Sequence, residues 1–410
     1  MPRGAAYDRK MTADDTTGAG PAGPGTVRGG AAGTHPLVIG HRGASGYRPE
    51  HTAAAYRLAF ALGADAVEPD LVATRDGVLV IRHENEISTT TDVAAHPEFA
   101  DRRRHVEVDG VRHTGWFTED FTWAELATLR CRERLGALRP LARSFDDRFR
   151  MLRFRDLLDL LDRVAEERDG AGARGGMPGL VAEVKHPTHF AALGLPLEEL
   201  MAAELRAHGG VPGELTVECF EPGALAEVRR QGVGGDLVYL IEATGAPADR
   251  VARDGAAARG YDEDVTDAGL AALAAWRGEA ADGMGGMGAA ESVVEPGRSA
   301  APDAAAVSSA PLLAGISVHT ARLGLDGARP AAVSGAKASP LVESAHRAGL
   351  GVFCWTLRAE NRFLPKAYRR GRGDAGIGDW HGWFRRVIES GVDGVFTDQP
   401  DLALDARASA

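Results

Sequence analysis

The feature that most constrains the fold is a regular alternation of short apolar runs with helical segments, which begins near residue 37. The apolar runs predict strands at residues 37–40, 66–72, 78–81, 179–184, 215–219, 237–241, 312–318, 351–355 and 394–396. The helical periodicities predict helices at 50–62, 122–129, 154–167, 196–208, 222–231, 267–276, 340–348 and 380–389. Apolar strands that alternate with helices in this way indicate an α/β protein whose parallel sheet is buried on both faces.

The number of strands favours a closed TIM-type (β/α)8 barrel with one strand left over. The runs 66–72 and 78–81 are separated by little more than the turn Thr74-Arg75-Asp76-Gly77, whereas a parallel crossover needs about a dozen residues. We therefore expect the surplus strand in this close pair. A barrel is favoured over an open sheet because polar residues follow nearly every strand, at the end where barrel enzymes assemble their sites.

Three segments fall outside the alternation. Residues 1–34 carry Gly, Ala and Pro without an apolar period, so we expect a disordered leader there. The barrel is expected over residues 35–405, with a polar, irregular insertion at 84–150 after the third predicted strand. A second insertion is expected at 278–310, where the sequence has low complexity.

Composition excludes several classes of protein. A net charge of −11, with 44% hydrophobic and 26% charged residues, is typical of a soluble globular protein and disfavours wholesale binding to nucleic acid. No run approaches the roughly 18 apolar residues that a spanning helix needs, so we expect no stable membrane insertion. Three cysteines without metal-binding spacing, and a start that lacks the apolar core of a signal peptide, favour a cytoplasmic location. The oligomeric state stays open.

Acidic side chains interrupt the apolar runs at strand ends. Glu68 and Asp70 are two residues apart, so on an extended strand both side chains point to the same face. Like charges this close repel each other unless a cation or a proton lies between them. Together with Glu183 they offer three hard oxygen ligands, which suit one divalent cation, Mg²⁺ or Ca²⁺. The alternative is that these carboxylates are simply solvated.

Histidines and cations follow the same predicted strand ends. His41 and His83 can serve as a proton acceptor and a proton donor, because imidazoles titrate near neutral pH. Arg42 and Lys185 suit a phosphate, although their role could also be to neutralise the neighbouring acids. Trp355 either lines the barrel or covers an apolar portion of a substrate.

Six sequence elements, in this order, resemble the glycerophosphodiester phosphodiesterases. They are His41-Arg42-Gly43, Pro49-Glu50-His51-Thr52, Glu68-x-Asp70, the strand ending in His83, Glu183-x-Lys185 and Phe396-Thr397-Asp398. The insertion after His83 and the run 359–365 are similar to the longer bacterial glycerophosphoryl diester phosphodiesterase subgroup. The family usually has Asp after the second histidine, whereas this chain has Glu84, whose side chain is one methylene longer.

The resemblance implies a TIM barrel that hydrolyses glycerophosphodiesters to sn-glycerol 3-phosphate and an alcohol. It implies that His41 and His83 act as general acid and base, without deciding which is which. It further implies a metal held by Glu68, Asp70 and Glu183, and phosphate contacts from Arg42 and Lys185. Attack by the glycerol 2-hydroxyl, through a cyclic phosphate, is the mechanism that the resemblance suggests.

Two other functions remain open at this point. One is a lysophospholipase D-like activity on a lipid substrate, which calls for an apolar rim that the low aromatic content of 6% does not favour. The other is a non-catalytic barrel that binds phosphodiesters, which we would expect to lack one of the histidines or carboxylates named above. None of them is missing, so we expect an enzyme with a small-molecule glycerophosphodiester as its substrate.

Overall fold

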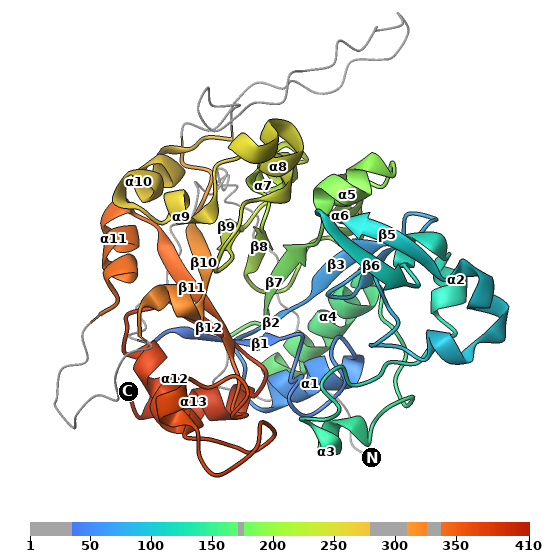
Figure 1. Ribbon diagram of the computed structural model, residues 1–410, viewed down its shortest axis with the longest axis horizontal. Helices are drawn as coiled ribbons and strands as arrows, with labels where there is room; N and C mark the ends of the chain where they lie inside the picture. Colours follow the sequence, from blue (N-terminus) through green and yellow to red (C-terminus); the bar gives the residue numbers. More distant parts are fainter. Residues whose placement is uncertain (1–34, 171–175, 279–309, 326–337) are drawn as a thin grey trace, which may run out of the picture.

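The computed structural model describes residues 35–170, 176–278, 310–325 and 338–410 (Figure 1). Its parallel strands are β1 (Leu37–His41), β2 (Ala66–Glu68) continued by β3 (Asp70–Ala73), β7 (Gly179–Val184), β8 (Leu215–Cys219), β9 (Asp236–Ile241), β10 (Gly315–His319), β11 (Gly351–Leu357) and β12 (Gly394–Thr397). Each strand pairs with the next, and β1 pairs with both β2 and β12, which closes the ring. The predicted (β/α)8 barrel is therefore confirmed.

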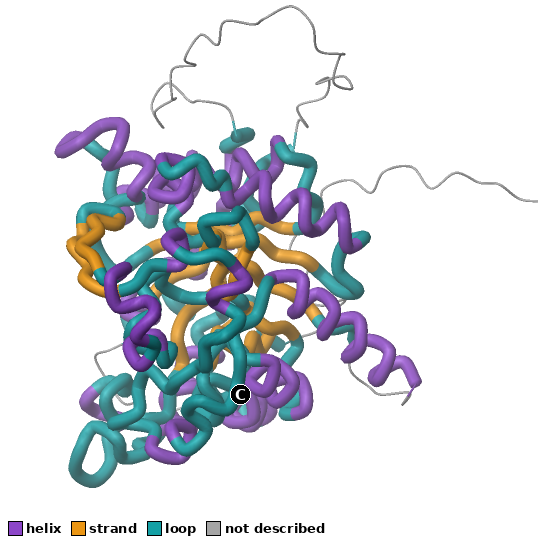
Figure 2. Tube along the Cα trace, turned by 90° about the vertical axis from the view of Figure 1, so that its right-hand side faces the viewer, coloured by secondary structure: helices purple, strands orange, loops and turns teal. Residues whose placement is uncertain are grey.

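Helices enclose the barrel strands, as Figure 2 shows. They are α1 (Ala53–Ala61), α4 (Phe154–Gly170), α5 (Pro187–Ala192), α6 (Leu197–His208), α7 (Pro222–Arg230), α8 (Ala248–Asp254), α9 (Tyr261–Asp264), α10 (Asp267–Ala275), α11 (Pro340–Ala348), α12 (Trp380–Ile388) and α13 (Pro400–Ala408). Local sequence sets their starts: the Thr52 side chain accepts a hydrogen bond from Ala55 N at the start of α1. Proline occupies the first turn of α7, α11 and α13, where its missing N–H costs nothing.

The surplus strand lies where the short turn predicts it. β4 (Leu79–Ile81) runs antiparallel to β3, with Leu71 opposite Ile81. Arg82 N donates a hydrogen bond to Asp70 O, so the chain returns to the level at which β3 began. The hairpin therefore delivers His83 to the rim of the barrel, close to Asp70.

The segment 84–150 contains more regular structure than the sequence analysis predicts. It holds a hairpin of β5 (Arg104–Val108) and β6 (Val111–Gly115), together with α2 (Trp123–Leu126) and α3 (Pro140–Arg143). The hairpin lies beside α5 (Figure 1), where Asp109 in its turn pairs with His186. Most β5 side chains are exposed, so the strand lacks the apolar alternation by which the others are recognised.

The barrel interior holds an apolar cluster that is separate from the larger core between strands and helices. The cluster consists of Ile39, Ala66, Val181, Val238, Phe353 and Phe396, from six different strands. Side chains alternate along a strand, so the residue two positions further on points to the same side. This register places positions 41, 68, 183, 355 and 398 directly above the cluster, towards the carboxyl ends of the strands.

The expected leader at 1–34 and nearly all of the expected insertion at 278–310 lie outside the described residues. Cys131, Cys219 and Cys354 are buried and free. Among the described helices, none is both long enough and apolar enough to cross a membrane.

Candidate active site

The residues predicted for the site all lie at one mouth of the barrel, at or beside the carboxyl ends of its strands. His41 ends β1, Glu68 ends β2, Asp70 begins β3, His83 follows β4, Glu183 lies near the end of β7, Lys185 follows β7, and Trp355 lies near the end of β11. Ion pairs join them across strands: Lys185 Nζ is 2.6 Å from Glu183 Oε1 and 3.1 Å from Asp70 Oδ1. The fold thus gathers acids and cations separated by more than a hundred residues.

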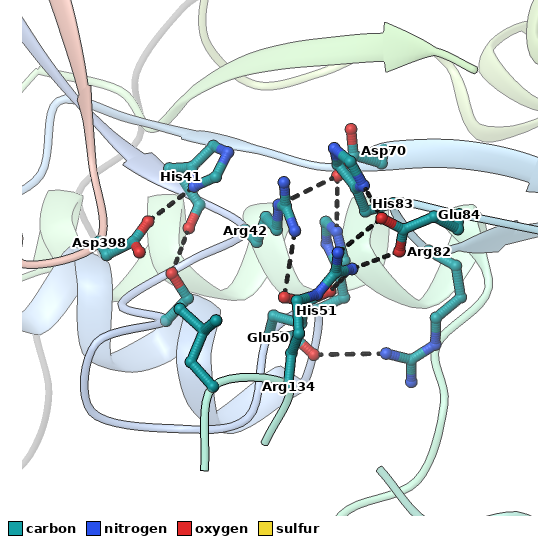
Figure 3. Close-up of polar contacts among 12 residues, drawn as sticks. His41, Arg42, Glu50, His51, Asp70, Arg82, His83, Glu84, Arg134 and Asp398 are labelled. Atoms are coloured by element: carbon teal, nitrogen blue, oxygen red, sulfur yellow. Dashed lines mark hydrogen bonds and ion pairs between the residues drawn. The ribbon is translucent and has the colours of Figure 1, made fainter. Parts of the chain in front are cut away.

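A tight turn after β1 positions Arg42. Its backbone has φ of 57°, and its N–H faces both the backbone O and the side-chain Oε2 of Glu68, at 3.1 and 2.8 Å. Gly43 follows with φ of 84°, and a Cβ there would lie 2.6 Å from the carbonyl carbon of Ala55 in α1. The Arg42 guanidinium pairs with Glu50 Oε2 at 3.1 Å and lies 3.5 Å from Asp70 Oδ2. In Figure 3 it lies between His41 and His83.

His41 forms a dyad with Asp398, which follows β12. Its Nδ1 is 2.7 Å from Asp398 Oδ1 (Figure 3). The carboxylate is almost fully buried. Burial opposes ionisation, but Arg358 and Arg139 hold the pKa of Asp398 well below its usual range. Burial, assisted by Arg42, lowers the pKa of His41 to about 4. A neutral imidazole that donates Nδ1–H to Asp398 keeps Nε2 available for proton transfer.

His83 has a matching partner in Glu84. Its Nδ1 is 2.6 Å from Glu84 Oε1, so the longer side chain still reaches the histidine. Both oxygens of Glu84 also accept hydrogen bonds from Arg134. Despite burial, His83 and Arg134 keep the pKa of Glu84 far below its ordinary value. Burial, with Arg42 and Lys185 nearby, lowers the pKa of His83 well below normal.

Three glutamates lie close together between these dyads. Glu68, Glu183 and Glu218 each offer a carboxylate oxygen, and these oxygens lie within 4.8 Å of one another. Glu68 Oε1 and Glu218 Oε2 are buried and accept no hydrogen bond from any described residue. Burial, followed by repulsion from neighbouring carboxylates, raises the pKa of Glu68 and Glu218 well above normal, and burial raises that of Glu183 to about 8. Three carboxylates this close together favour a proton or a cation between them, in addition to the ion pair of Glu183 with Lys185.

Glu218, the next-to-last residue of β8, is not among the residues predicted from the sequence. The sequence does carry a signal for Glu218, because it is an acid within an apolar strand, as Glu68 and Glu183 are. The donor set, made only of carboxylate oxygens with two of them unpartnered, fits a hard divalent cation.

Asp70 has a different environment from the three glutamates. His51 Nε2 lies 2.8 Å from Asp70 Oδ2, and the buried imidazole is fixed in turn by Tyr56 OH, 2.7 Å from its Nδ1. Although burial opposes ionisation, Lys185, His83 and His51 hold the pKa of Asp70 well below normal. Asp70 is therefore an ionised link between the carboxylates and the cations. His51 belongs to the Pro49-Glu50-His51-Thr52 motif, but nothing in the sequence indicates that it binds Asp70.

Trp355 lies on an aromatic side of the mouth. Its ring packs edge-to-face with Phe220 at 5.7 Å between centroids, and with His319 at 5.1 Å. Lys185 Nζ lies 5.6 Å from the centre of the Phe220 ring. The aromatic side chains of Trp355 and Phe220 therefore lie next to Lys185, which is expected to contact phosphate.

Comparison with known proteins agrees with this arrangement. The model of the glycerophosphoryl diester phosphodiesterase family matches residues 41–262 and 288–402. A glycerophosphodiester phosphodiesterase of Arabidopsis thaliana is 48% identical over 101 residues, which are 25% of this chain and 27% of the plant protein. One from Haemophilus influenzae is 40% identical over 97 residues, 24% of each chain. The chain thus spans about a quarter of the length of these curated relatives.

The fold also matches solved structures. A crystal structure of a Silicibacter pomeroyi protein, provisionally named glycerophosphoryl diester phosphodiesterase, gives a TM-score of 0.56 at 21% identity. The match covers 92% of this chain and 95% of that one, and at this identity it concerns the fold alone. The family model, by contrast, spans most of the chain from His41 to Leu402. The chain therefore belongs to the glycerophosphoryl diester phosphodiesterase family.

Proposed function

We propose that this protein hydrolyses glycerophosphodiesters to sn-glycerol 3-phosphate and an alcohol by histidine acid/base catalysis. The observation that carries the proposal is the pair of dyads at one mouth, His41 with Asp398 and His83 with Glu84. In each dyad a carboxylate engages Nδ1, which leaves Nε2 for the substrate. Held in this way, one imidazole can accept a proton at Nε2 when it is neutral, and the other can donate one when it is protonated there.

The cation site belongs to the same proposal. We place Mg²⁺ or Ca²⁺ with Glu68, Asp70 and Glu183, and we add Glu218 as a further ligand. Asp70 is included because its Oδ1 accepts no hydrogen bond from the described residues and pairs only with Lys185. When bound, the cation supplies Lewis-acid polarisation of a phosphate oxygen.

Arg42 and Lys185 would carry the charge of the phosphate. Both are buried, and their carboxylate partners hold their side chains beside the glutamate cluster. Fixed charges in a water-poor site stabilise a phosphoryl transition state without reorganising. Trp355 and Phe220 would border the less polar part of the substrate.

The chemistry proceeds in two displacements at phosphorus. First, one histidine, in its neutral form, takes the proton of the glycerol 2-hydroxyl as its oxygen bonds to phosphorus. The other, which enters this step as the imidazolium, donates its Nε2 proton to the departing alcohol oxygen. Then the second histidine takes a proton from water as the water oxygen bonds to phosphorus, and the first returns its proton to the 2-oxygen as the ring opens. The sum is diester plus water giving glycerol phosphate plus alcohol, and intramolecular attack makes the first step fast.

A turnover panel tests this proposal. Purified protein is incubated with glycerophosphocholine, glycerophosphoethanolamine and lysophosphatidylcholine, and released sn-glycerol 3-phosphate and choline are measured. We expect turnover of the two glycerophosphodiesters, loss of activity in EDTA, and recovery with Mg²⁺ or Ca²⁺. Turnover of lysophosphatidylcholine alone would reassign the protein to lipid substrates, and binding without turnover would make it a non-catalytic barrel.

A further inference from the structure

Two arginines of the insertion at 84–150 contact residues of the active site. Arg134 and Arg139 lie in the loop that precedes α3, and each reaches the carboxylate behind one of the two histidines. A segment far from the barrel strands in the sequence thereby contacts both dyads.

Arg139 is the more enclosed of the two, with 6% of its surface exposed. Its Nη2 donates to Asp398 Oδ2 at 2.6 Å, and its Nε donates to Glu360, which follows β11. Its Nη1 donates to the carbonyl of Ser45, in the loop after β1, at 3.1 Å. The guanidinium thus joins the insertion to three loops of the barrel mouth at once.

Arg134 makes the corresponding contacts at the other dyad. It donates to both oxygens of Glu84, and its Nη2 lies 2.7 Å from Glu50 Oε1. The other oxygen of Glu50 accepts a hydrogen bond from Arg42 at 3.1 Å. Arg134 therefore links the partner of His83 to the arginine proposed to bind phosphate (Figure 3).

The loop between the two arginines is a short, internally bonded turn. Leu138 N and Arg139 N both donate to Leu135 O, at 2.7 and 2.9 Å, and Leu135 N donates to Glu133 Oε1 at 2.8 Å. The spacing of Arg134 and Arg139 is thereby fixed by local structure. Two planar guanidinium groups on a closed turn can set the orientation of the carboxylates that they bind.

We propose that Arg134 and Arg139 are positioning residues for catalysis: by fixing Glu84 and Asp398, the insertion holds each imidazole ring with Nδ1–H on its carboxylate and Nε2 facing the mouth. This inference rests on the proposed acid/base roles of His41 and His83. It assigns the insertion a part in the chemistry, beyond covering the barrel. A role in folding alone predicts a different result, because it requires no effect on the histidine rings in a folded variant.

The test compares Arg134→Ala and Arg139→Ala with the wild type and with Arg132→Ala. Arg132 lies in the same insertion and binds Asp147 through a similar two-contact fork, but it touches neither histidine partner. We expect kcat to fall about 10- to 100-fold in the two test variants, as for other residues that orient catalytic groups, with KM changed less than threefold. The Arg132 variant is expected to retain wild-type kcat.

Two further readouts separate positioning from stability. Added guanidinium at non-denaturing concentration is expected to restore much of the kcat of Arg139→Ala, because it can refill the emptied site. In protein labelled with ¹⁵N-histidine, the His41 and His83 ring signals are expected to lose their Nδ1–H tautomer in the matching arginine variant. Arg134→Lys and Arg139→Lys, which keep the charge, replace any alanine variant that fails to fold.

Unchanged kcat and unchanged histidine ring signals in folded variants would overturn the inference. If the wild type turns over no glycerophosphodiester, the proposed function fails instead. The ring signals then still decide whether the arginines set the tautomers.

Discussion

His41 Nδ1 lies 2.7 Å from Asp398 Oδ1, across 357 residues of sequence. The contact depends on closure of the ring, because β1 pairs with β12 in the register that sets Gly40 beside Thr397. His83, by contrast, bonds to Glu84, its immediate neighbour in the chain. The two dyads are chemically alike, yet one is a product of tertiary structure and the other is almost local.

Replacing either histidine should remove most of the activity. We expect His41→Ala and His83→Ala each to lower kcat by about 10²-fold or more, since each removes a proton-transfer group. The fold should persist, because Asp398 keeps two arginine partners and Glu84 keeps one. Steady-state kinetics and thermal melting check this, with His105→Ala, on the exposed face of β5, as the control. Near-normal turnover in either variant would remove that histidine from the mechanism.

Replacing Glu218 should weaken cation binding and at the same time stabilise the metal-free protein. Glu218→Gln removes one of the buried charges, so divalent affinity is expected to fall about 10-fold or more. The metal-free variant is expected to melt at a higher temperature than the wild type at pH 8, because a buried, unpartnered carboxylate is gone. Calorimetric titration with Mg²⁺ or Ca²⁺ and melting in chelator measure the two effects. Glu214→Gln, exposed just before β8, is the matched control, and equal affinity in both variants would exclude Glu218 as a ligand.

Acid should destabilise the protein through its buried histidine. The pKa of His41 falls from 6.5 to about 4 on burial, so between these values the unfolded chain binds a proton that the folded chain does not. The free energy of unfolding therefore rises with pH across this window, by about 1.4 kcal/mol per pH unit for this one proton. Urea denaturation from pH 4 to 8 measures the slope, which His41→Asn should reduce. An unchanged slope would show that His41 is not held neutral.

Replacing Gly43 by alanine should reduce the stability of the fold more than the same replacement at another glycine whose φ is also positive. Gly43→Ala combines a positive φ of 84° with a clash against the α1 backbone, and we expect a loss of about 2–5 kcal/mol. Gly110→Ala, in the β5–β6 turn, has φ of 78° and open space around its Cβ, so about 1–2 kcal/mol is expected. Chemical denaturation measures both losses. Equal losses of stability would mean that only the positive φ matters at Gly43, and that the contact with α1 does not.

Much of the barrel could be predicted from the sequence, because buried parallel strands leave continuous apolar runs. The same rule found Glu68 and Glu183, whose charges interrupt such runs, and it should also have indicated Glu218 in β8. The β5–β6 hairpin could not be predicted in this way, because its exposed strands carry no alternation of apolar residues.

The partners of the histidines were harder to predict. The contact of Arg139 with Asp398 joins residues 259 apart, and no local pattern specifies which distant arginine meets which acid. Such pairings are set by the register of the barrel and by the path of the insertion, both of which are properties of the folded chain.

The β3–β4 hairpin makes the placement of His83 depend on two short strands of matched length. Because Leu71 lies opposite Ile81, a single residue added inside β4 would turn every following side chain to the opposite face. His83 would then point away from the mouth although its neighbours in the chain were unaltered. The exposed tip at Asp76 is tied to the insertion instead: Asp76 Oδ1 accepts a hydrogen bond from Trp123 N, and Arg75 N donates one to Phe121 O. A change of length at the tip would therefore disturb the start of α2, whereas one inside β4 would misplace His83.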